Sequence, residues 1–403
     1  MNAHPPPTLR RAQRGFSLIE IMIGLVIGLI SVLVIYQVYN VAEGFKRNTT
    51  AAGEAQMNGL FSTFVLGMEL TNGGAAIAVS AADLAVCPDT GDIATSFRPV
   101  PVLITDGGGA TSPDSFVVNY SIATTAATAM MFNYKDPAAK TTNYSPGDAY
   151  NIQSPGGVHV GDLIVAVNPN GPTCVGSKVT AVAAQPAISV NLYGVATDVA
   201  NVTITHTGTT GSFAGDGRPG LSTLFNMGPA NRAQKVRYSV VNGVLYSTPL
   251  LDSNGVPLAN PVPNPLASNI VNMKVEYGID SAPTDGLLDT WVQASDANWS
   301  PATLLAAPIT TINQIKAIRI GFIVRSEQFD KTLAGFTGGD YVNGDYQWVL
   351  FDCNKSPKTL CPVRLTGTIP AGCNLLPLVP GNCRFRKYET VIPLRNEIWN
   401  KAT

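Results

Sequence analysis

The distribution of apolar and polar positions divides the chain into two parts of different character. From Phe16 to Tyr39 nearly every residue is apolar, and Glu20 is the only side chain in that stretch expected to carry a charge. About 20 apolar residues are enough for a helix to cross the hydrocarbon core of a bilayer. A carboxylate near one end of such a segment is costly in lipid, so Glu20 is a candidate functional residue.

The helical pattern continues beyond this apolar stretch. No proline occurs between Pro7 and Pro88, although the chain contains 29 prolines, and proline breaks helices. We therefore expect one helix from Phe16 to about Gly73, where two consecutive glycines form a stop signal. Its second half is amphipathic, and we expect its apolar face to pack on the globular part of the protein. The members of that face follow i, i+3, i+4, i+7 spacing: Phe61, Phe64, Val65 and Met68.

After Ala75 the apolar period changes to two, which predicts strands. The expected strands cover residues 114–120, 159–167, 235–241, 270–277, 315–325 and 388–394. Asn242-Gly243 predicts a tight hairpin with a return strand at 244–246. The ranges 181–215 and 352–383 are expected to be loop-rich insertions. The predicted fold class is α+β, with a long N-terminal helix packed on a β-rich globular domain.

Composition narrows the class of protein. The net charge is -1 and 13% of residues are charged, which argues against nucleic acid as a partner because phosphate binding needs a basic surface. The chain has 38 Gly and 29 Pro, a composition typical of a β-rich, loop-rich extracellular protein.

All six cysteines follow the apolar segment, and an even number on the outer side of a membrane suggests disulfides. Fifteen pairings are possible. We expect Cys87 to pair with Cys174, Cys353 with Cys361, and Cys373 with Cys383, because the last two pairs close short loops. Buried free thiols are the alternative. No Cys-x-x-Cys spacing occurs, which argues against zinc binding and thioredoxin-type chemistry.

The start of the chain resembles a known processing signal. Arg10, Arg11 and Arg14 precede Gly15-Phe16-Ser17-Leu18-Ile19-Glu20, an arrangement that closely resembles the class III signal of type IV prepilins and type II secretion pseudopilins. An ordinary secretory signal would need small residues at a cleavage site after the apolar stretch, and residues 39–43 are a poor site. A plain signal anchor has no need of the glycine and phenylalanine at positions 15 and 16.

This resemblance implies specific roles for three residues. The prepilin peptidase would cut between Gly15 and Phe16, Phe16 would become the N-methylated N-terminus, and Glu20 would be the fifth mature residue. A free amine and a carboxylate in an apolar filament core each need an opposite partner. We therefore expect a neighbour's amine to meet Glu20 and to set the axial register between subunits.

Five downstream blocks resemble PilW-type minor pilins and, more loosely, the J-type minor pseudopilins of type II secretion. They are residues 113–116, 242–246, 274–280, 318–326 and 392–396. The region 121–215 lies outside this resemblance and is the candidate for what is peculiar to this chain. The domain organisation implied is a leader at 1–15, a pilin helix at 16–74 and a β-rich periplasmic or extracellular domain at 75–403.

The resemblance also implies a function and a location. We expect a minor pilin that takes part in type IV pilus assembly, in the priming or tip complex, because a bulky domain fits a filament shaft poorly. The implied partners are the prepilin peptidase, the major pilin, other minor pilins and the inner-membrane assembly platform. The protein would cross the inner membrane once, with its C-terminal domain in the periplasm, and then enter the pilus at the cell surface. Two alternatives stay open: an adhesin displayed by the pilus that binds through region 121–215 or the Cys-rich tail, and a minor pseudopilin of a type II secretion system.

Catalytic chemistry is not indicated, so we expect neither an enzyme nor a cofactor. His4 lies in the leader, and His159 and His206 fall in strand-like segments where structural or surface roles are expected. No Gly-x-Ser-x-Gly elbow, HExxH pair or phosphate-binding glycine loop occurs. One metal candidate is a calcium site formed by Asp280, Asp285 and Asp289. The alternative is that these are ordinary residues of a hairpin loop.

Overall fold

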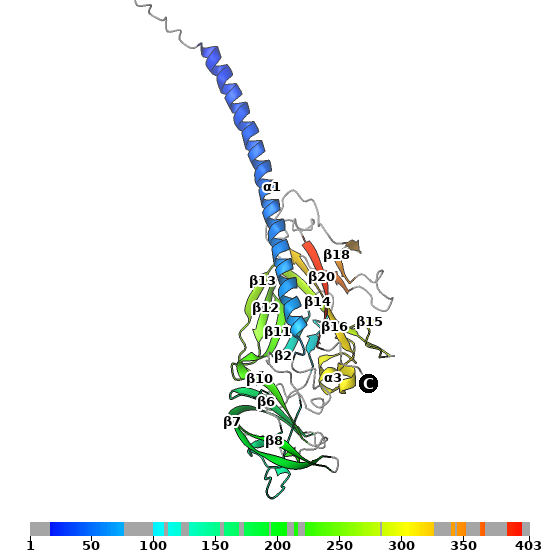
Figure 1. The fold of residues 1–403 in the computed structure, drawn as a ribbon. Coiled ribbons are helices and arrows are strands. Elements are labelled where there is room, and N and C mark those ends of the chain that lie inside the picture. Colours follow the sequence, from blue (N-terminus) through cyan, green and yellow to red (C-terminus); the bar gives the residue numbers. More distant parts are fainter. Residues whose placement is uncertain are drawn as a thin grey trace, which may run out of the picture.

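One long helix leads into a β-rich domain, which confirms the α+β fold class (Figure 1). This computed structural model describes residues 17–75, 100–108, 112–121, 129–153, 157–168, 173–192, 195–207, 213–216, 222–282, 284–325, 340–342, 345–351, 363–366 and 385–396.

The helix, α1, covers Leu18–Asn72 and has 55 residues. Gly73 caps its C-terminus, and the Gly73 N–H donates to the Leu70 carbonyl oxygen at 3.0 Å. The predicted end of the helix is therefore confirmed, whereas Phe16, the predicted start, lies outside the described residues. The segment Leu18–Lys46 has a mean hydropathy of 2.9 and is not buried against the rest of the protein. By length and composition it can cross a membrane.

Two antiparallel sheets form the main domain. The first has the strand order β1-β2-β11-β12-β13 and the second β15-β14-β16-β20. The bounds of the first sheet are β1 Val102–Thr105, β2 Ser115–Ser121, β11 Ala233–Val241, β12 Val244–Pro249 and β13 Asn264–Ser268. The bounds of the second are β14 Ile270–Ile279, β15 Thr290–Gln293, β16 Ile315–Arg325 and β20 Phe385–Pro393.

The predicted hairpin at Asn242-Gly243 is confirmed. Both residues have positive φ angles, 51° and 78°, as a two-residue turn matched to the strand twist requires.

The second sheet is accompanied by two short helices, α3 Pro301–Ala306 and α4 Ile309–Ile312. A three-stranded sheet follows, with the order β17-β18-β19. Its bounds are β17 Asp340–Val342, β18 Asp345–Leu350 and β19 Val363–Thr366.

A single apolar core joins the two main sheets to one face of α1. Alternation along β14 places Met273, Val275 and Tyr277 in this core, because successive side chains of a strand point to opposite faces. The helix contributes Ala55, Leu66 and Leu70. The helix is therefore part of the fold over its second half and free of it over its first half (Figure 1).

A second unit, here called the insert, lies between β2 and β11 and has core clusters of its own. Its six-stranded sheet has the order β3-β10-β6-β7-β8-β5. The elements of the insert are β3 Met130–Met131, β4 Asn143–Tyr144, β5 Tyr150–Ile152, β6 Asp162–Asn168, β7 Thr173–Leu192, β8 Val195–His206, β9 Phe213–Ala214, β10 Thr223–Pro229 and the 3₁₀ helix η2 Ala230–Arg232. It lies at the end of the molecule farthest from the start of α1 (Figure 1).

The range 181–215 was expected to be loop-rich, and that prediction is wrong for most of it. The strands β7 and β8 pair from Val179 with His206 to Leu192 with Val195. Their outer parts contain mostly small or neutral residues, and many of these are exposed. The pattern therefore lacks the apolar alternation that reveals a half-buried strand. The other expected loop-rich range, 352–383, lies outside the described residues except for β19.

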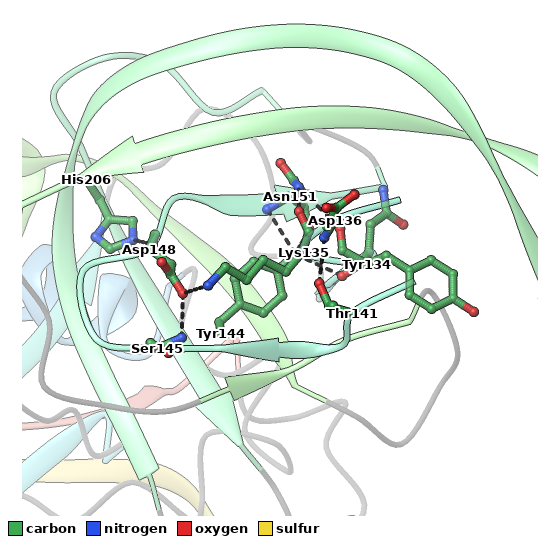
Figure 2. A network of polar contacts seen from close by, with 10 residues as sticks. Tyr134, Lys135, Asp136, Thr141, Tyr144, Ser145, Asp148, Asn151 and His206 are labelled. Carbon is green, nitrogen blue, oxygen red and sulfur yellow. Dashed lines mark hydrogen bonds and ion pairs between the residues drawn. The ribbon is translucent and has the colours of Figure 1, made fainter. Parts of the chain in front are cut away.

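A polar network holds the loop between β3 and β5 (Figure 2). The Lys135 ammonium pairs with Asp148 at 2.5 Å, and Asp148 also accepts the Ser145 backbone N–H. The hydrogen bond from Lys135, with the Ser145 bond and the charge of Lys135, lowers the pKa of Asp148. His206 contacts the Asp148 carbonyl oxygen at 2.9 Å and stacks on Tyr150 with ring centroids 4.0 Å apart. His206 therefore has a structural environment, as predicted.

Candidate functional site

The first part of the candidate site is the start of α1. Glu20 lies in the first turn of the helix and is exposed, where a negative charge interacts favourably with the helix dipole. In the part of the chain that the structure describes, no basic side chain forms an ion pair with Glu20. Gly15 and Phe16 lie outside the described residues, so their predicted roles stay predictions.

The second half of α1 has two apolar faces, and the smaller side chains face the protein. Every residue of the packed face is buried, and spacings of three or four connect its members: Ala55, Gly59, Ser62, Leu66 and Leu70. A Cβ added at Gly59 would lie 2.2 Å from Cε2 of Tyr388. The small residues therefore let the helix approach the sheet closely.

The larger apolar side chains lie on the other face, so the predicted packing face is wrong. Phe61, Phe64 and Met68 are 46%, 66% and 52% exposed. Phe64 lies about 160° around the helix from Leu66, at 100° per residue. We call this exposed face the apolar stripe; its members are Met57, Leu60, Phe61, Phe64 and Met68. The stripe follows the exposed apolar segment Leu18–Lys46 along the same helix, so α1 presents apolar surface to solvent over most of its length.

Hydrogen bonds fix the helix on the domain at several levels. The Asn58 amide donates to the Ser268 carbonyl oxygen at 3.2 Å, and the Asn396 amide donates to that of Gly73 at 3.1 Å. Between them, the Tyr120 hydroxyl donates to the Glu69 carboxylate at 2.8 Å. Burial and the Glu69 carboxylate raise the pKa of Tyr120, so this hydroxyl stays protonated and keeps donating. The orientation of the apolar stripe is therefore fixed by the domain.

Two buried ion pairs connect the strands beneath the helix. Lys274 pairs with Asp114 at 2.7 Å, and both side chains are about 95% buried. Arg319 pairs with Glu276 across β14 and β16. The Arg319 guanidinium lies 4.9 Å from the Trp291 ring centroid and 4.3 Å from that of Phe351. Such charges are tolerated in a core only when they are paired and hydrogen-bonded.

Sequence reasoning missed these ion pairs, although three of the blocks that carried the resemblance contain them. A signal was available: Lys274 and Glu276 are two residues apart within an otherwise largely apolar strand, so both face the same side of the sheet. Their partners could not be chosen from sequence, because Asp114 is 160 residues away from Lys274.

The calcium candidate does not form a three-carboxylate cluster. The Asp280 side chain accepts the backbone N–H groups of Asp285 and Gly286, at 3.2 and 2.8 Å. Asp289 accepts both the backbone N–H and the hydroxyl of Ser281. These carboxylates stabilise the hairpin loop, which was the alternative interpretation. Among the described residues, no three His, Cys, Asp or Glu side chains are grouped as metal ligands.

The structure describes only some of the remaining candidate residues. His159 is exposed at the surface, and its backbone N–H donates to Asp162 at 2.8 Å. Cys174 is buried in the insert and forms a disulfide. The other five cysteines lie outside the described residues, so the predicted pairings, including Cys87 with Cys174, stay predictions.

Comparisons with known proteins match two parts of the chain. Residues 10–36 match the prokaryotic N-terminal methylation motif, and residues 237–396 match the family described as type IV pilus-assembly protein W. The insert lies entirely outside both matches. A solved structure of a type IV-like pilin from Thermus thermophilus is similar at 14% identity and a TM-score of 0.22, covering 42% of this chain and 71% of that one. A comparison with curated proteins gives no match.

The two family matches agree with the arrangement of α1 and the main sheets. The methylation motif falls where the exposed apolar helix begins, and the second match covers most of the strands that hold that helix. These two matches support a PilW-type minor pilin of the type IV pilin superfamily.

Proposed function

We propose that this protein takes part in type IV pilus assembly in the priming or tip complex, which it enters through α1. The observation that carries the proposal is the pair of exposed apolar surfaces on one helix, the segment Leu18–Lys46 and the apolar stripe. Exposed apolar patches of this extent mark membrane or protein contacts. A helix that leaves the membrane for a bundle of like helices exchanges one apolar environment for another.

Processing creates the polar part of the docking site in this proposal. The prepilin peptidase removes residues 1–15, and the new amine of Phe16 is methylated. That amine, from a neighbouring subunit, is the partner that the Glu20 carboxylate needs once the helix is buried. An unpaired carboxylate in an apolar environment is strongly disfavoured, so only one axial offset between neighbouring helices satisfies the pair.

The apolar stripe supports contacts with other pilin subunits beyond the membrane segment. It begins at Met57, after the membrane-spanning stretch ends, and it faces away from the domain of its own chain. We propose that α1 of another minor pilin, or of the major pilin, packs there. In this view the inner-membrane assembly platform receives the protein with its domain on the periplasmic side.

The position of the insert supports a place at the tip over one in the shaft. It lies at the end of the molecule opposite the start of α1 (Figure 1). In a helical shaft, every subunit has others stacked above and below it, and an added unit at that end competes for their space. A subunit at the tip has no neighbour above it.

Replacement of Glu20 by Ala tests the docking role. We expect fewer pili and less of the variant in sheared pili, with the amount in the membrane unchanged. Glu43→Ala on the same helix is the matched control and should leave both amounts as in the wild type. Normal numbers of pili that carry the Glu20 variant as often as the wild-type protein would refute the docking role.

A second function, adhesion through the insert, is favoured by two observations. The insert has its own core clusters and lies outside the residues matched to pilin families. We propose it as an added binding unit on a pilin framework. Cells whose pili carry an intact main domain but lack the insert should assemble pili and lose attachment to a surface.

A further inference from the structure

A cavity of about 490 Å³ lies where the insert meets the main domain. Its walls come from the turn before β6, from β7, from the end of β10 with η2, and from the loop after β12. That loop packs tightly on the insert: a Cβ added at Gly255 would lie only 2.4 Å from Cδ1 of Leu163. The volume falls in the range of about 300–1,000 Å³ that is usual for small-molecule sites.

A rigid set of polar groups lines the cavity. The Asp162 residue is 3% exposed, and its carboxylate accepts the His159 N–H at 2.8 Å and the Asn226 amide at 3.1 Å. The side-chain oxygen Oδ1 of Asn226 accepts the Gly228 N–H at 2.8 Å. Each member is held by another, so the groups are oriented before any ligand arrives. Such preorganisation reduces the entropy lost on binding.

The two charged residues that line the cavity have opposite signs and favour a neutral ligand. Asp162 supplies one negative charge, and Lys178 supplies one positive charge whose ammonium donates to Asn254 at 2.9 Å. A polyphosphate or a nucleic acid needs several basic groups, and the nearby carboxylate repels anions. A metal cation is repelled by the lysine, and the described residues contain no three-ligand group.

The remaining lining combines hydrogen-bonding groups with small apolar ones. Asn231 and Ser253 are exposed at the cavity, and each can both donate and accept. Val160, which is 65% exposed, and Pro229 add apolar surface beside them. A ligand that presents hydroxyl groups along its edge and C–H groups on its face matches this distribution.

We propose that this cavity is a binding site for a neutral saccharide. The Asp162 carboxylate, held in place by Asn226, and the Asn231 amide would bind the hydroxyl groups, and Lys178 would donate to a ring or hydroxyl oxygen. Of the lining residues, only Ser253 lies within the region matched to the pilus-assembly family. The site therefore belongs to this chain's insert, and it does not depend on the proposed role in assembly.

The test uses the full chain, purified in a zwitterionic detergent so that no glycoside detergent competes. An array of neutral mono- and oligosaccharides is the first probe, and titration of the bound sugars by calorimetry follows. Ser253→Trp should block the cavity and abolish binding, whereas Ser253→Ala is the matched control and should retain it. Lys178→Met should weaken binding about tenfold, as expected for one hydrogen bond from a charged donor.

Thermal melting of each variant shows whether it is folded, and both Ser253 and Lys178 lie near the surface, where substitution leaves the core intact. Neutral sugars that bind the wild type and Ser253→Ala but not a folded Ser253→Trp would support the site. Equal binding by Ser253→Trp, no neutral sugar bound by the wild type, or binding of charged saccharides alone would each overturn it. Pilus counts should be the same in all variants, so this result is independent of the Glu20 test.

Discussion

The ring of Tyr388 on β20 lies against Gly59 of α1, where there is no room for a Cβ. The same tyrosine stacks on Phe322 with ring centroids 5.9 Å apart, and its hydroxyl donates to the Ala55 carbonyl oxygen at 3.5 Å. The ring is therefore held from two sides. Gly59 fixes how closely the helix approaches the second sheet and, through that, which helical face remains exposed.

Gly59→Ala should destabilise the protein even though alanine favours helices. Overpacking against a fixed ring costs about 1–3 kcal/mol, and the gain in helix propensity offsets about 1 kcal/mol of that. Gly67→Ala is the matched control, because nothing lies within 4 Å of a Cβ added there. It should stabilise the protein by up to about 1 kcal/mol. Thermal melting of the full chain in detergent measures both, and equal shifts in the same direction would contradict the close contact.

Substitutions at Phe64 and Leu66 should distinguish an effect on pilus assembly from an effect on the stability of the protein. Phe64 is 66% exposed, so Phe64→Ser should leave the melting temperature nearly unchanged but reduce the amount of protein found in sheared pili. Leu66 is fully buried, and Leu66→Ala should cost about 2–5 kcal/mol. If Phe64→Ser entered pili as well as the wild type, the apolar stripe would not be a subunit contact.

These two residues also show what the sequence could and could not reveal about the helix. Its length follows from the absence of proline, a local property that the sequence displays directly. The choice of packed face does not, because the second half of α1 has two apolar faces and the larger side chains suggest the wrong one. The distance between helix and sheet decides the outcome, and Tyr388, more than 300 residues away from Gly59, sets that distance.

The same distinction applies to the strands and the ion pairs. Alternation and the Asn242-Gly243 turn predicted β2, β11, β12, β14, β16 and β20 of the main sheets, because these signals lie within a few residues, whereas the shorter strands β1, β13 and β15 were not predicted. The outer parts of strands β7 and β8 were not predicted, because small neutral residues on an exposed ribbon show no apolar alternation. The partner of Lys274 could not be predicted, because it depends on which strands become neighbours.

A double-mutant cycle at Asp114 and Lys274 should show strong coupling. Lys274→Met leaves a buried carboxylate without its cation and should cost about 3–5 kcal/mol at neutral pH. The double variant Asp114→Asn, Lys274→Met should recover much of that loss, because no charge remains buried. Urea unfolding of the four proteins measures the coupling, and strictly additive effects would show that the two groups do not interact.

Acid should partly rescue Lys274→Met. Burial raises the pKa of Asp114 above 3.8, while Lys274 opposes that rise. A group with a raised folded-state pKa contributes most stability below its unfolded pKa and loses that contribution as the pH rises through its folded pKa. Without Lys274 the folded pKa rises further, so the melting temperature of the variant should approach that of the wild type as the pH falls toward 3.8. A constant difference between the two across that range would refute this assignment.

The main domain should fold without the insert. Strand β2 ends at Ser121 and β11 begins at Ala233, and these two residues are paired neighbours in one sheet. An Asn-Gly turn in place of residues 122–232 could therefore join the strands as a hairpin. The apolar core shared by α1 and the two main sheets contains no residue of the insert. Leu251 packs only in a core cluster of the insert and would become exposed, so the variant should carry Leu251→Ser as well.

We expect this shortened protein to melt cooperatively and to enter pili in normal amounts, while saccharide binding and surface attachment are lost. Circular dichroism, counts of pili by electron microscopy and an attachment assay measure the three properties separately. A folded variant that fails to support pili would assign the insert to assembly, through contacts with a neighbouring subunit. An unfolded variant would show that the main sheets depend on the insert, for example through the hydrogen bond from the Ser121 hydroxyl to the Met227 carbonyl oxygen.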